Sequence, residues 1–379
     1  MIGAANRVRP GIIALTASLG LVVSAIARPQ PSTVAMMLAV SEAQISPDGT
    51  SVVFSLGATV PVAAGDAGAT IWRVPFAGGD PVRLSGDAVD HAQPRWSPDG
   101  QRIAFLARER RGAPARVRLI PSGGGAGAWI TNLLTDVSVF GLAPDGSRLA
   151  YAGRPVESGA TSHLWIQGLS AAAPPPRRVE GVGLVTSLSW APSGQAVALV
   201  ERTAASATRV LMVPMSGPAR VVYADSSPAA DVACSPDGRR VAWLTSGDAG
   251  NQNAARVFLA PTDGGPARVL PIAGGGSVRA LAWAGADHLS MVLAGNRERH
   301  MDVVDVATGT RVTVMPPGIA GIAGAPSWSA DGTRYVVAGS GTDHPPEVFA
   351  GSLPRRAPSG PDTVGAPPPP VRRITFSNR

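Results

Sequence analysis

The side chains best suited to catalysis are few in this sequence and lie far apart. The histidines share no short metal-ligand spacing and are spread along the chain; they are His91, His163, His288, His300 and His344. A Gly-x-Ser-x-Gly elbow, which exposes a nucleophilic serine between a strand and a helix, does not occur. The pattern therefore predicts no metal site, no cofactor and no catalytic residue on this chain.

Another set of polar side chains is better suited to binding than to chemistry. These residues stand before or at the start of apolar segments, outside the recurring turns described below; they are Asp90, His91, Gln93, Asp136, Asp231 and Arg279, with Asp87 nearby. Carboxylate, amide and guanidinium groups can hydrogen-bond a peptide or protein partner. Such residues serve either a binding role or an ordinary solvated-loop role, and the elements that position them decide between the two.

The chain is organised by a repeated turn, best preserved as Trp-Ser-Pro-Asp-Gly at 96–100. Proline presets φ for a tight turn, aspartate bonds back to its own backbone, and glycine tolerates positive φ. The copies of the residue in the place of serine are spaced by 51, 46, 48, 44, 49 and 45 residues; they are Ser46, Ser97, Ala143, Ala191, Ser235, Ala284 and Ser329. Apolar segments on both sides predict a hairpin at each turn, and the period predicts a repeat architecture.

Each repeat holds up to four short apolar segments, and the segment after the turn pairs a small residue with a large one, as in Ala104-Phe105 and Ala242-Trp243. A strand that is apolar on both faces must be covered on both. In a propeller every sheet lies between two others, so small and large residues can interdigitate. The sequence therefore predicts an all-β fold, a seven-bladed β-propeller of four-stranded blades, closed by packing alone with no strand exchanged between its ends.

This architecture gives the binding candidates a common place. The connections that lead into the innermost strands would ring one mouth of the central channel, where residues from several blades converge. Asp90, His91, Gln93, Asp136, Asp231 and Arg279 are therefore predicted channel-mouth residues. The recurring turn carboxylates Asp99, Asp145 and Asp237 are instead predicted to serve the turn itself.

Composition agrees with a turn-rich β protein: the chain has 379 residues, 45% of them hydrophobic, with 45 glycines and 36 prolines. The net charge of +7 comes from arginine alone, because the chain has no lysine. The arginines are scattered, and no basic run has the interleaved aromatic residues of a nucleic-acid surface, so no nucleic-acid partner is expected. A single cysteine, Cys234, excludes an internal disulfide and stands where other repeats have tryptophan, which predicts an apolar filler.

The N-terminus predicts a cleaved signal peptide over residues 1–27. Arg7 and Arg9 precede an apolar run, and Ala25-Ile26-Ala27 is a small-x-small cleavage signal. An uncleaved anchor is the alternative, but the apolar run is short for a membrane span. We expect residues 28–40 to be a lead-in and 41–378 to be the propeller, in a periplasmic or secreted protein without an integral membrane span after cleavage.

The repeat resembles the TolB-type, WD40-like propeller repeat. Residues 40–49, together with 342–348 and 372–378, resemble the first and last blades of the N-terminal propeller in the prolyl oligopeptidase family, especially its acylaminoacyl-peptidase and dipeptidyl-peptidase-like branches. The resemblance covers about residues 36 to 378 and implies a propeller fold. It is weak evidence for function, because unrelated proteins share such repeats.

The resemblance also implies a hydrolase domain after the propeller, which would bring a serine, an aspartate and a histidine. This sequence ends at Arg379, about where that domain would begin, so no catalytic residue of the family is carried over. Two hypotheses follow. The chain is an exported, non-catalytic propeller that binds a protein or peptide, or it is the substrate-gating propeller of a serine peptidase whose catalytic domain is separately encoded or missing.

Overall fold

The structure is a computed structural model that describes residues 38–58, 68–86, 89–157, 162–203, 207–225, 228–245, 255–271, 277–294, 299–315, 319, 321–341, 344–353 and 370–375. All of them belong to one compact unit, residues 36–379. The predicted signal peptide and most of the proline-rich stretch 354–370 lie outside the described residues. No described segment is helical.

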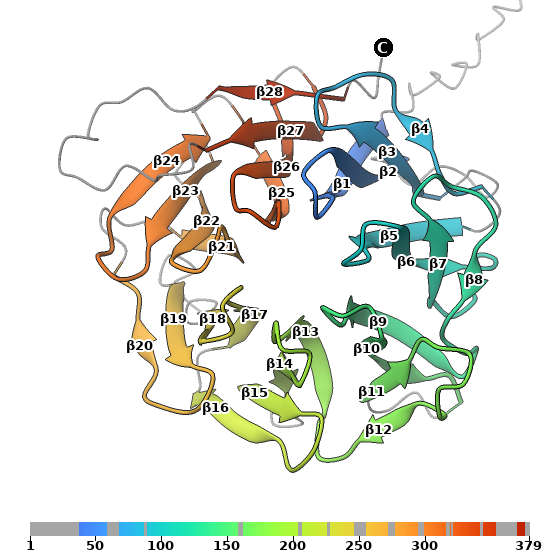
Figure 1. Cartoon of the computed structure of the whole chain (residues 1–379), viewed down its shortest axis with the longest axis vertical. Coiled ribbons are helices and arrows are strands. Elements are labelled where there is room, and N and C mark those ends of the chain that lie inside the picture. Colours follow the sequence, from blue (N-terminus) through green and yellow to red (C-terminus); the bar gives the residue numbers. More distant parts are fainter. Residues whose placement is uncertain are drawn as a thin grey trace, which may run out of the picture. The chain divides into compact units, whose positions relative to one another are not determined.

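Twenty-eight strands form seven antiparallel sheets of four strands, and each sheet is built from consecutive strands (Figure 1). The innermost strands are β1 (Leu38–Ile45), β5 (Val89–Trp96), β9 (Thr135–Leu142), β13 (Leu184–Trp190), β17 (Ala229–Cys234), β21 (Ser277–Trp283) and β25 (Gly321–Trp328). The second strands are β2 (Ser51–Ala58), β6 (Arg102–Arg108), β10 (Arg148–Pro155), β14 (Ala196–Arg202), β18 (Arg240–Thr245), β22 (His288–Ala294) and β26 (Arg334–Ser340).

The third strands are β3 (Thr70–Pro75), β7 (Arg116–Pro121), β11 (His163–Gly168), β15 (Thr208–Pro214), β19 (Arg256–Pro261), β23 (Arg299–Asp305) and β27 (Glu347–Ser352). The outer strands are β4 (Val82–Arg83), β8 (Ala128–Trp129), β12 (Arg177–Val179), β16 (Arg220–Asp225), β20 (Arg268–Val269), β24 (Arg311–Met315) and β28 (Val371–Arg373). The predicted all-β, seven-bladed propeller is confirmed. Because β1 begins at Leu38, the last three residues of the predicted lead-in belong to the first blade.

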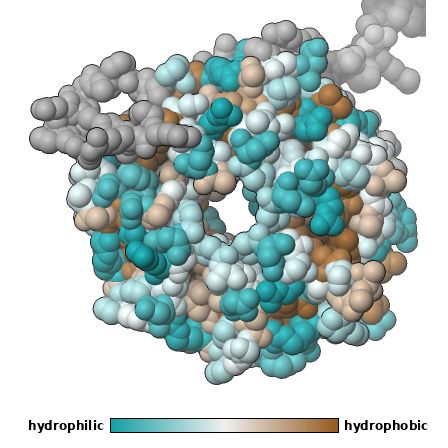
Figure 2. Space-filling view, in the orientation of Figure 1, coloured by the Kyte–Doolittle hydropathy of each residue, from teal (hydrophilic) through white to brown (hydrophobic). Residues whose placement is uncertain are grey.

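The cores between blades explain the alternation of small and large residues. In one core Ala198 packs with Trp243 of the next blade, and in another Ala104 packs with Tyr151. All four side chains are 2% exposed or less. In these cores the large residue of one blade fills the space that the small residue of the preceding blade leaves, and the blades form a ring around a central opening (Figure 2).

The ring closes without an exchanged strand, because the first and last sheets each use only their own strands. The prediction of closure by packing alone is nevertheless wrong in part. The Val40 N–H donates to the Pro346 carbonyl at 2.8 Å, and Arg334 Nη1 donates to the Gly49 carbonyl at 2.8 Å. Arg372 donates to the carbonyls of Phe76 and Ala77. Hydrogen bonds therefore join the two ends of the ring in addition to apolar contact.

Two faces of the ring are distinguished below. We call the side on which the seven inner strands begin the loop face. We call the side on which they end, at the turns beginning with Ser46, Ser97, Ala143, Ala191, Ser235, Ala284 and Ser329, the turn face.

Candidate functional site: the channel wall and the turn face

Most inner strands carry a β-bulge at one equivalent place near the loop face. The residue skipped in the pairing with the second strand is exposed, while the residue before it is buried; these bulged residues are Ser41, Ser138, Thr186, Ala230 and Arg279. Bulges re-aim side chains, and the inner strands surround the channel (Figure 1). Among these five, Arg279 alone is charged, and no hydrogen bond or ion pair joins its side chain to another described residue.

The inner strand of the second blade, β5, departs furthest from the repeat. Its pairing with β6 shifts twice, between Val89 and Ala92 and again between Ala92 and Arg95. Asp90 (φ 55°) and Gln93 (φ 52°) lie within these shifts, and no other described non-glycine residue has a positive φ. Such backbone costs free energy and concentrates at functional sites.

The two strained residues present different groups. The Asp90 side chain is exposed, and its backbone lies so close to Gly68 that a Cβ on that glycine would stand 2.6 Å from the Asp90 nitrogen. Gln93 Nε2 donates to the Ser138 carbonyl of the next blade at 3.0 Å, while its Oε1 is buried with no hydrogen-bond partner among the described atoms. Gln93 therefore ties two blades together through its nitrogen and leaves a buried acceptor unsatisfied.

His91, although predicted at the channel mouth, is fully buried. Its Nδ1 lies 2.6 Å from Ser85 Oγ, and its ring meets Phe105 edge-on at 5.1 Å. A ligand in the channel therefore does not reach this side chain. The backbone N–H of His91 donates to the Ala69 carbonyl at 2.9 Å, which ties the start of β5 to the first blade.

The Ser85–His91 pair is one contact that sequence reasoning did not foresee, since no motif places a histidine beside a serine. A serine hydroxyl bonded to a histidine can be a nucleophile and its base. Here Ser85 is 5% exposed and accepts the Ile71 N–H at 2.9 Å. Thr131 and Thr375 accept third-strand N–H groups of their own blades in the same way. The hydroxyl is thus a repeated structural device.

Asp136 lies at the start of β9 and holds the neighbouring loop. Its Oδ1 accepts the Ala115 N–H at 2.7 Å and lies 3.3 Å from Arg108 Nη1. The side chain is nevertheless 48% exposed. Asp136 is therefore placed where a ligand could meet it, but part of its hydrogen-bonding capacity serves the fold.

Asp231 lies on β17 and joins two adjacent blades. Its Oδ1 accepts from Ser187 Oγ at 2.8 Å and from the Val232 N–H at 2.9 Å. Burial raises the pKa of the Asp231 carboxyl, and these two hydrogen bonds and the positive charge of Arg95 oppose the rise. Arg95, on β5, also pairs with Glu42 of β1 at 2.5 Å. Charged groups of blades one, two and five thus act on one another.

The structure does not join the six predicted residues to one another. They lie on four inner strands around the ring, and no hydrogen bond or ion pair connects any two of them. Arg95, Glu42 and Ser187 are the wall residues that sequence reasoning missed. Their signal was their place in the inner strands of the aligned repeats.

The turn face is regular by comparison. In the turn of the second blade, Ser97 Oγ donates to Asp99 Oδ1, and that oxygen also accepts the Gln101 N–H at 3.0 Å. These bonds lower the pKa of Asp99. Asp48, Asp145 and Asp237 likewise accept N–H groups of their own turns, and their pKa values are lowered too. The prediction that these carboxylates serve the turns is confirmed.

Cys234 is half-buried at the turn end of β17, and burial raises the pKa of its thiol to about 11. Its Sγ lies 3.8 Å from the Ser189 carbonyl. At equivalent places the indole N–H groups of Trp190 and Trp283 donate to the Gly141 and Ala233 carbonyls of the preceding blades. The thiol therefore occupies a tryptophan position and makes the corresponding contact, as a filler would.

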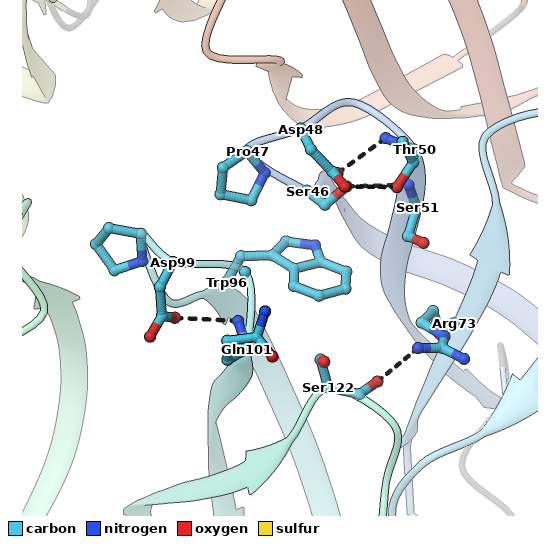
Figure 3. Close-up of a pocket in the computed structure, with 12 residues that line it drawn as sticks. Ser46, Pro47, Asp48, Thr50, Ser51, Arg73, Trp96, Asp99, Gln101 and Ser122 are labelled. Atoms are coloured by element: carbon cyan, nitrogen blue, oxygen red, sulfur yellow. Dashed lines mark hydrogen bonds between the residues drawn. The ribbon is translucent and has the colours of Figure 1, made fainter.

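A pocket of about 370 Å³ opens on the turn face between blades one and two (Figure 3). The Trp96 ring lies at its centre, with Asp48 and Thr50 on one side and Arg73 and Ser122 on another. Arg73 Nη1 donates to the Ser122 carbonyl at 2.9 Å. No cluster of metal-binding side chains occurs in the described part of the chain. Nor does that part contain a helix long and apolar enough to cross a membrane.

These features define a seven-bladed propeller with a polar channel wall and one polar pocket between blades. No protein-family model matches the chain, and no curated protein matches it. Among solved structures, the β-propeller domain of the Trilobed protease from Pyrococcus furiosus matches with a TM-score of 0.65 at 13% identity, over 90% of this chain and 99% of that one. That domain is described as having an open velcro topology, which agrees with the ring closure found here.

A puromycin-hydrolyzing peptidase from Mycobacterium tuberculosis matches with a TM-score of 0.66 at 17% identity, over 90% of this chain. This chain covers 53% of that peptidase, and the same share of an acylaminoacyl peptidase from Pyrococcus horikoshii. A protein from Agrobacterium tumefaciens described as a "putative TolB" matches over 67% of this chain and 91% of that one, at 17% identity and a TM-score of 0.50. These neighbours thus include propellers of the two kinds that the sequence resembles, and at these identities they show the fold alone.

Proposed function

We propose that this chain is an exported, non-catalytic propeller that binds a protein or peptide at the loop-face mouth of its channel. The observation that carries the proposal is the strained backbone of Asp90 and Gln93 on β5. Strain of this kind persists where a function needs it, and both residues stand among the groups that the sequence analysis chose on other grounds.

The chemistry of the wall suits a peptide. An exposed carboxylate at Asp90 and a guanidinium at Arg279 that pairs with no other described residue offer both an acceptor and donors. Backbone amides and side chains of a peptide present the same mixture. Contributions from separate blades would let one peptide be held at several points around the mouth.

The test is binding of labelled arginine-free peptides, acidic, neutral and lysine-rich, to the purified chain by fluorescence anisotropy. We expect at least one class to bind, and Asp90→Ala and Arg279→Ala to weaken it by about tenfold or more, since each removes a charged hydrogen-bonding group. Arg239→Ala is the matched control, because Arg239 is exposed in a turn on the opposite face. Absence of binding, or equal losses in all three variants, would contradict the proposal.

Export is a separate part of the proposal and rests on residues 1–27. The small-x-small signal at 25–27 is expected to be cleaved, so the mature chain should begin at Arg28 or within a few residues of it. N-terminal sequencing of the protein from its native envelope fraction measures this directly. A cytoplasmic chain that retains Met1 would contradict it.

The second candidate is a substrate-gating propeller that works with a serine-peptidase domain. It is favoured by the matches to whole peptidases, of which this chain covers 53%. The discriminating observation is the neighbouring coding sequence. A reading frame for a Gly-x-Ser-x-Gly hydrolase would decide for the gate, and the purified propeller alone should then remain inactive on acyl-peptide substrates and unlabelled by an active-site serine reagent.

A further inference from the structure

The repeats show what normally fills the space between two turns on the turn face. In blade three, Arg148 is the first residue of the second strand and crosses to blade four. Its Nη2 donates to the Gly194 carbonyl at 2.9 Å, and its guanidinium carbon lies 5.7 Å from the centre of the Trp190 ring. The same nitrogen lies 3.9 Å from Asp145 Oδ2 in its own turn. A carbonyl, a ring face and a carboxylate thus surround this guanidinium.

Blade five repeats the arrangement with Arg240. Its guanidinium carbon lies 5.9 Å from the centre of the Trp283 ring, and Nη2 lies 2.6 Å from Asp287 Oδ1 and 3.9 Å from Asp237 Oδ2. At the equivalent place in blade seven, Arg334 donates to the Gly49 carbonyl. An arginine at this place is therefore a recurring bridge between blades.

Blade one keeps the surroundings but lacks the arginine. Ser51 occupies the place of Arg148, as the first residue of β2. The counterparts of Asp145, Trp190 and Gly194 are Asp48, Trp96 and Gly100 in the aligned turns, and these three residues and Ser51 all line the pocket of about 370 Å³. The pocket is thus the space that an arginine side chain fills elsewhere in the ring.

The exposure of the tryptophan rings agrees with a missing arginine side chain in this pocket. Trp190 and Trp283, which the arginines cover, are 8% and 7% exposed. Trp96 is half-buried, and its indole N–H is already used by the Gln44 carbonyl at 3.2 Å, so its ring face remains for contact.

The other blades do not offer the same pocket. Blade four has Ala196 at this place, but it faces Cys234 and no indole ring. Blade six has His288, which lies 3.9 Å from Asp305. Only between blades one and two are an indole ring and a short first residue combined in the described chain.

We infer that the pocket between blades one and two binds a guanidinium group, supplied by an arginine side chain of a peptide or protein partner. Asp48 and the Gly100 carbonyl would accept its N–H groups, and the Trp96 ring would lie against its plane. Arg73 also lines the pocket, but its bond to the Ser122 carbonyl holds it at another side, as Figure 3 shows. This site lies on the turn face, so the inference does not rest on the proposed function of the channel mouth.

The first test uses a blocked Gly-Arg-Gly peptide and its citrulline counterpart, which keeps the shape but removes the charge. The readout is the set of indole N–H signals of the nitrogen-labelled full chain, in which Trp96 is identified by its loss in Trp96→Leu. We expect the arginine peptide to shift the Trp96 signal saturably, with an affinity at least about tenfold above that of the citrulline peptide. A lysine peptide should bind more weakly, because an ammonium lacks the planar fork.

The second test places an arginine in the interface that lacks one and removes the arginine from an interface that has one. Ser51→Arg supplies the arginine from the chain itself and should lower the affinity for the arginine peptide by about tenfold or more, with the fold retained because four other blades carry arginine there, at Arg102, Arg148, Arg240 and Arg334. Arg148→Ser should open the equivalent space and make the Trp190 signal respond to the peptide as well. Ser216→Arg, which adds the same charge to an exposed position on the turn face, is the control and should leave the affinity unchanged.

Three results would overturn the inference. They are no shift of the Trp96 signal by the arginine peptide, equal affinities for the arginine and citrulline peptides, or binding that survives Ser51→Arg in a folded protein. Loss of channel-mouth binding in Asp90→Ala has no bearing on any of them, because the peptides of that assay contain no arginine.

Discussion

The two ends of strand β5 behave differently. At the turn end, Ser97, Asp99 and Gly100 satisfy one another within a turn that other blades repeat. At the loop end, Asp90 and Gln93 adopt positive φ, and the pairing with β6 shifts twice. One strand thus joins a part of the molecule that follows the repeat to a part that breaks it.

The difference shows how a repeat protein separates scaffold from candidate site. Where seven copies use the same contact, the contact serves the fold. Where one copy departs, as Arg279 does among the small bulged residues or Ser51 does among the bridging arginines, a group or a space is released for a partner. The predictions below test whether the regular part carries the stability and the irregular part does not.

The largest effect is expected in the core between blades. Trp243 is fully buried and fills the space beside Ala198, so Trp243→Ala should lower the free energy of unfolding by about 3–5 kcal/mol. Arg279→Ala, at the exposed loop end of β21, should change it by less than about 0.5 kcal/mol. Urea unfolding measures the stability of both variants. Similar losses of stability in the two would contradict the distinction between the core and the loop face.

A smaller effect is expected from the backbone at the two ends of β5. Gly100 has a φ of 69°, so Gly100→Ala should cost about 1–2 kcal/mol of stability. Asp90→Gly, at a φ of 55°, relieves strain instead and should leave the protein at least as stable as the wild type, although peptide binding is weakened. A marked destabilisation by Asp90→Gly in thermal unfolding would show that this conformation belongs to the scaffold.

The turn hydroxyl should contribute less again. Ser97 Oγ accepts the Arg102 N–H at 2.8 Å and donates to Asp99, so Ser97→Ala should cost about 1 kcal/mol. Ala143→Ser, which installs a hydroxyl at the equivalent place of blade three, should instead raise the free energy of unfolding. If chemical denaturation shows the same sign for both changes, the turns are not equivalent.

The smallest expected effect is a difference in how stability depends on pH between Asp231, near the loop face, and Asp99, on the turn face. Burial raises the folded-state pKa of Asp231, so its stabilising contribution is largest below the unfolded value of about 3.9 and declines as the pH rises through the raised value. Asp231→Asn should therefore be slightly more stable than the wild type at neutral pH, by under about 1 kcal/mol, with the two curves converging in acid.

Asp99 supplies the opposite case for the same measurement. Its folded-state pKa is lowered by Ser97 and Gln101, so its contribution is present above the unfolded value and is lost as the pH falls through the lowered one. Asp99→Asn should be less stable than the wild type at neutral pH and approach it in acid. Unfolding curves between neutral and acid pH measure both variants. If Asp231→Asn and Asp99→Asn change the stability in the same direction at neutral pH, the expected difference between the two carboxyl groups is wrong.

The fold was predictable because its signals are local and repeated. The turn glycines Gly49, Gly100, Gly146, Gly194, Gly238 and Gly332 have φ values of 67° to 73°, as expected for the glycine of the repeated turn. The small and large residues of the second strands meet across blades as expected. The hydrogen bonds that Arg372 makes at the closing seam were missed, since their acceptors lie 295 and 296 residues away in sequence.

The site was less predictable, because it depends on where the repeat fails. His91 stands beside Asp90 in sequence, but strand alternation and the Ser85 hydroxyl take it into the core. The bulges have no sequence signature here, since Asp90 and Gln93 are not glycines. The pocket beside Trp96 follows from the absence of an arginine at Ser51, which becomes visible only when the structure shows what Arg148 does.

The most direct measurement of the central claim is amide hydrogen exchange of the chain with and without a bound arginine-free peptide, followed by mass spectrometry. We expect slower exchange in segments that contain the loop ends of β5 and β21, around Asp90–Gln93 and Arg279, and unchanged exchange in the turns around Asp99 and Asp237. Protection confined to the turn face, with the loop ends of the inner strands unchanged, would contradict it.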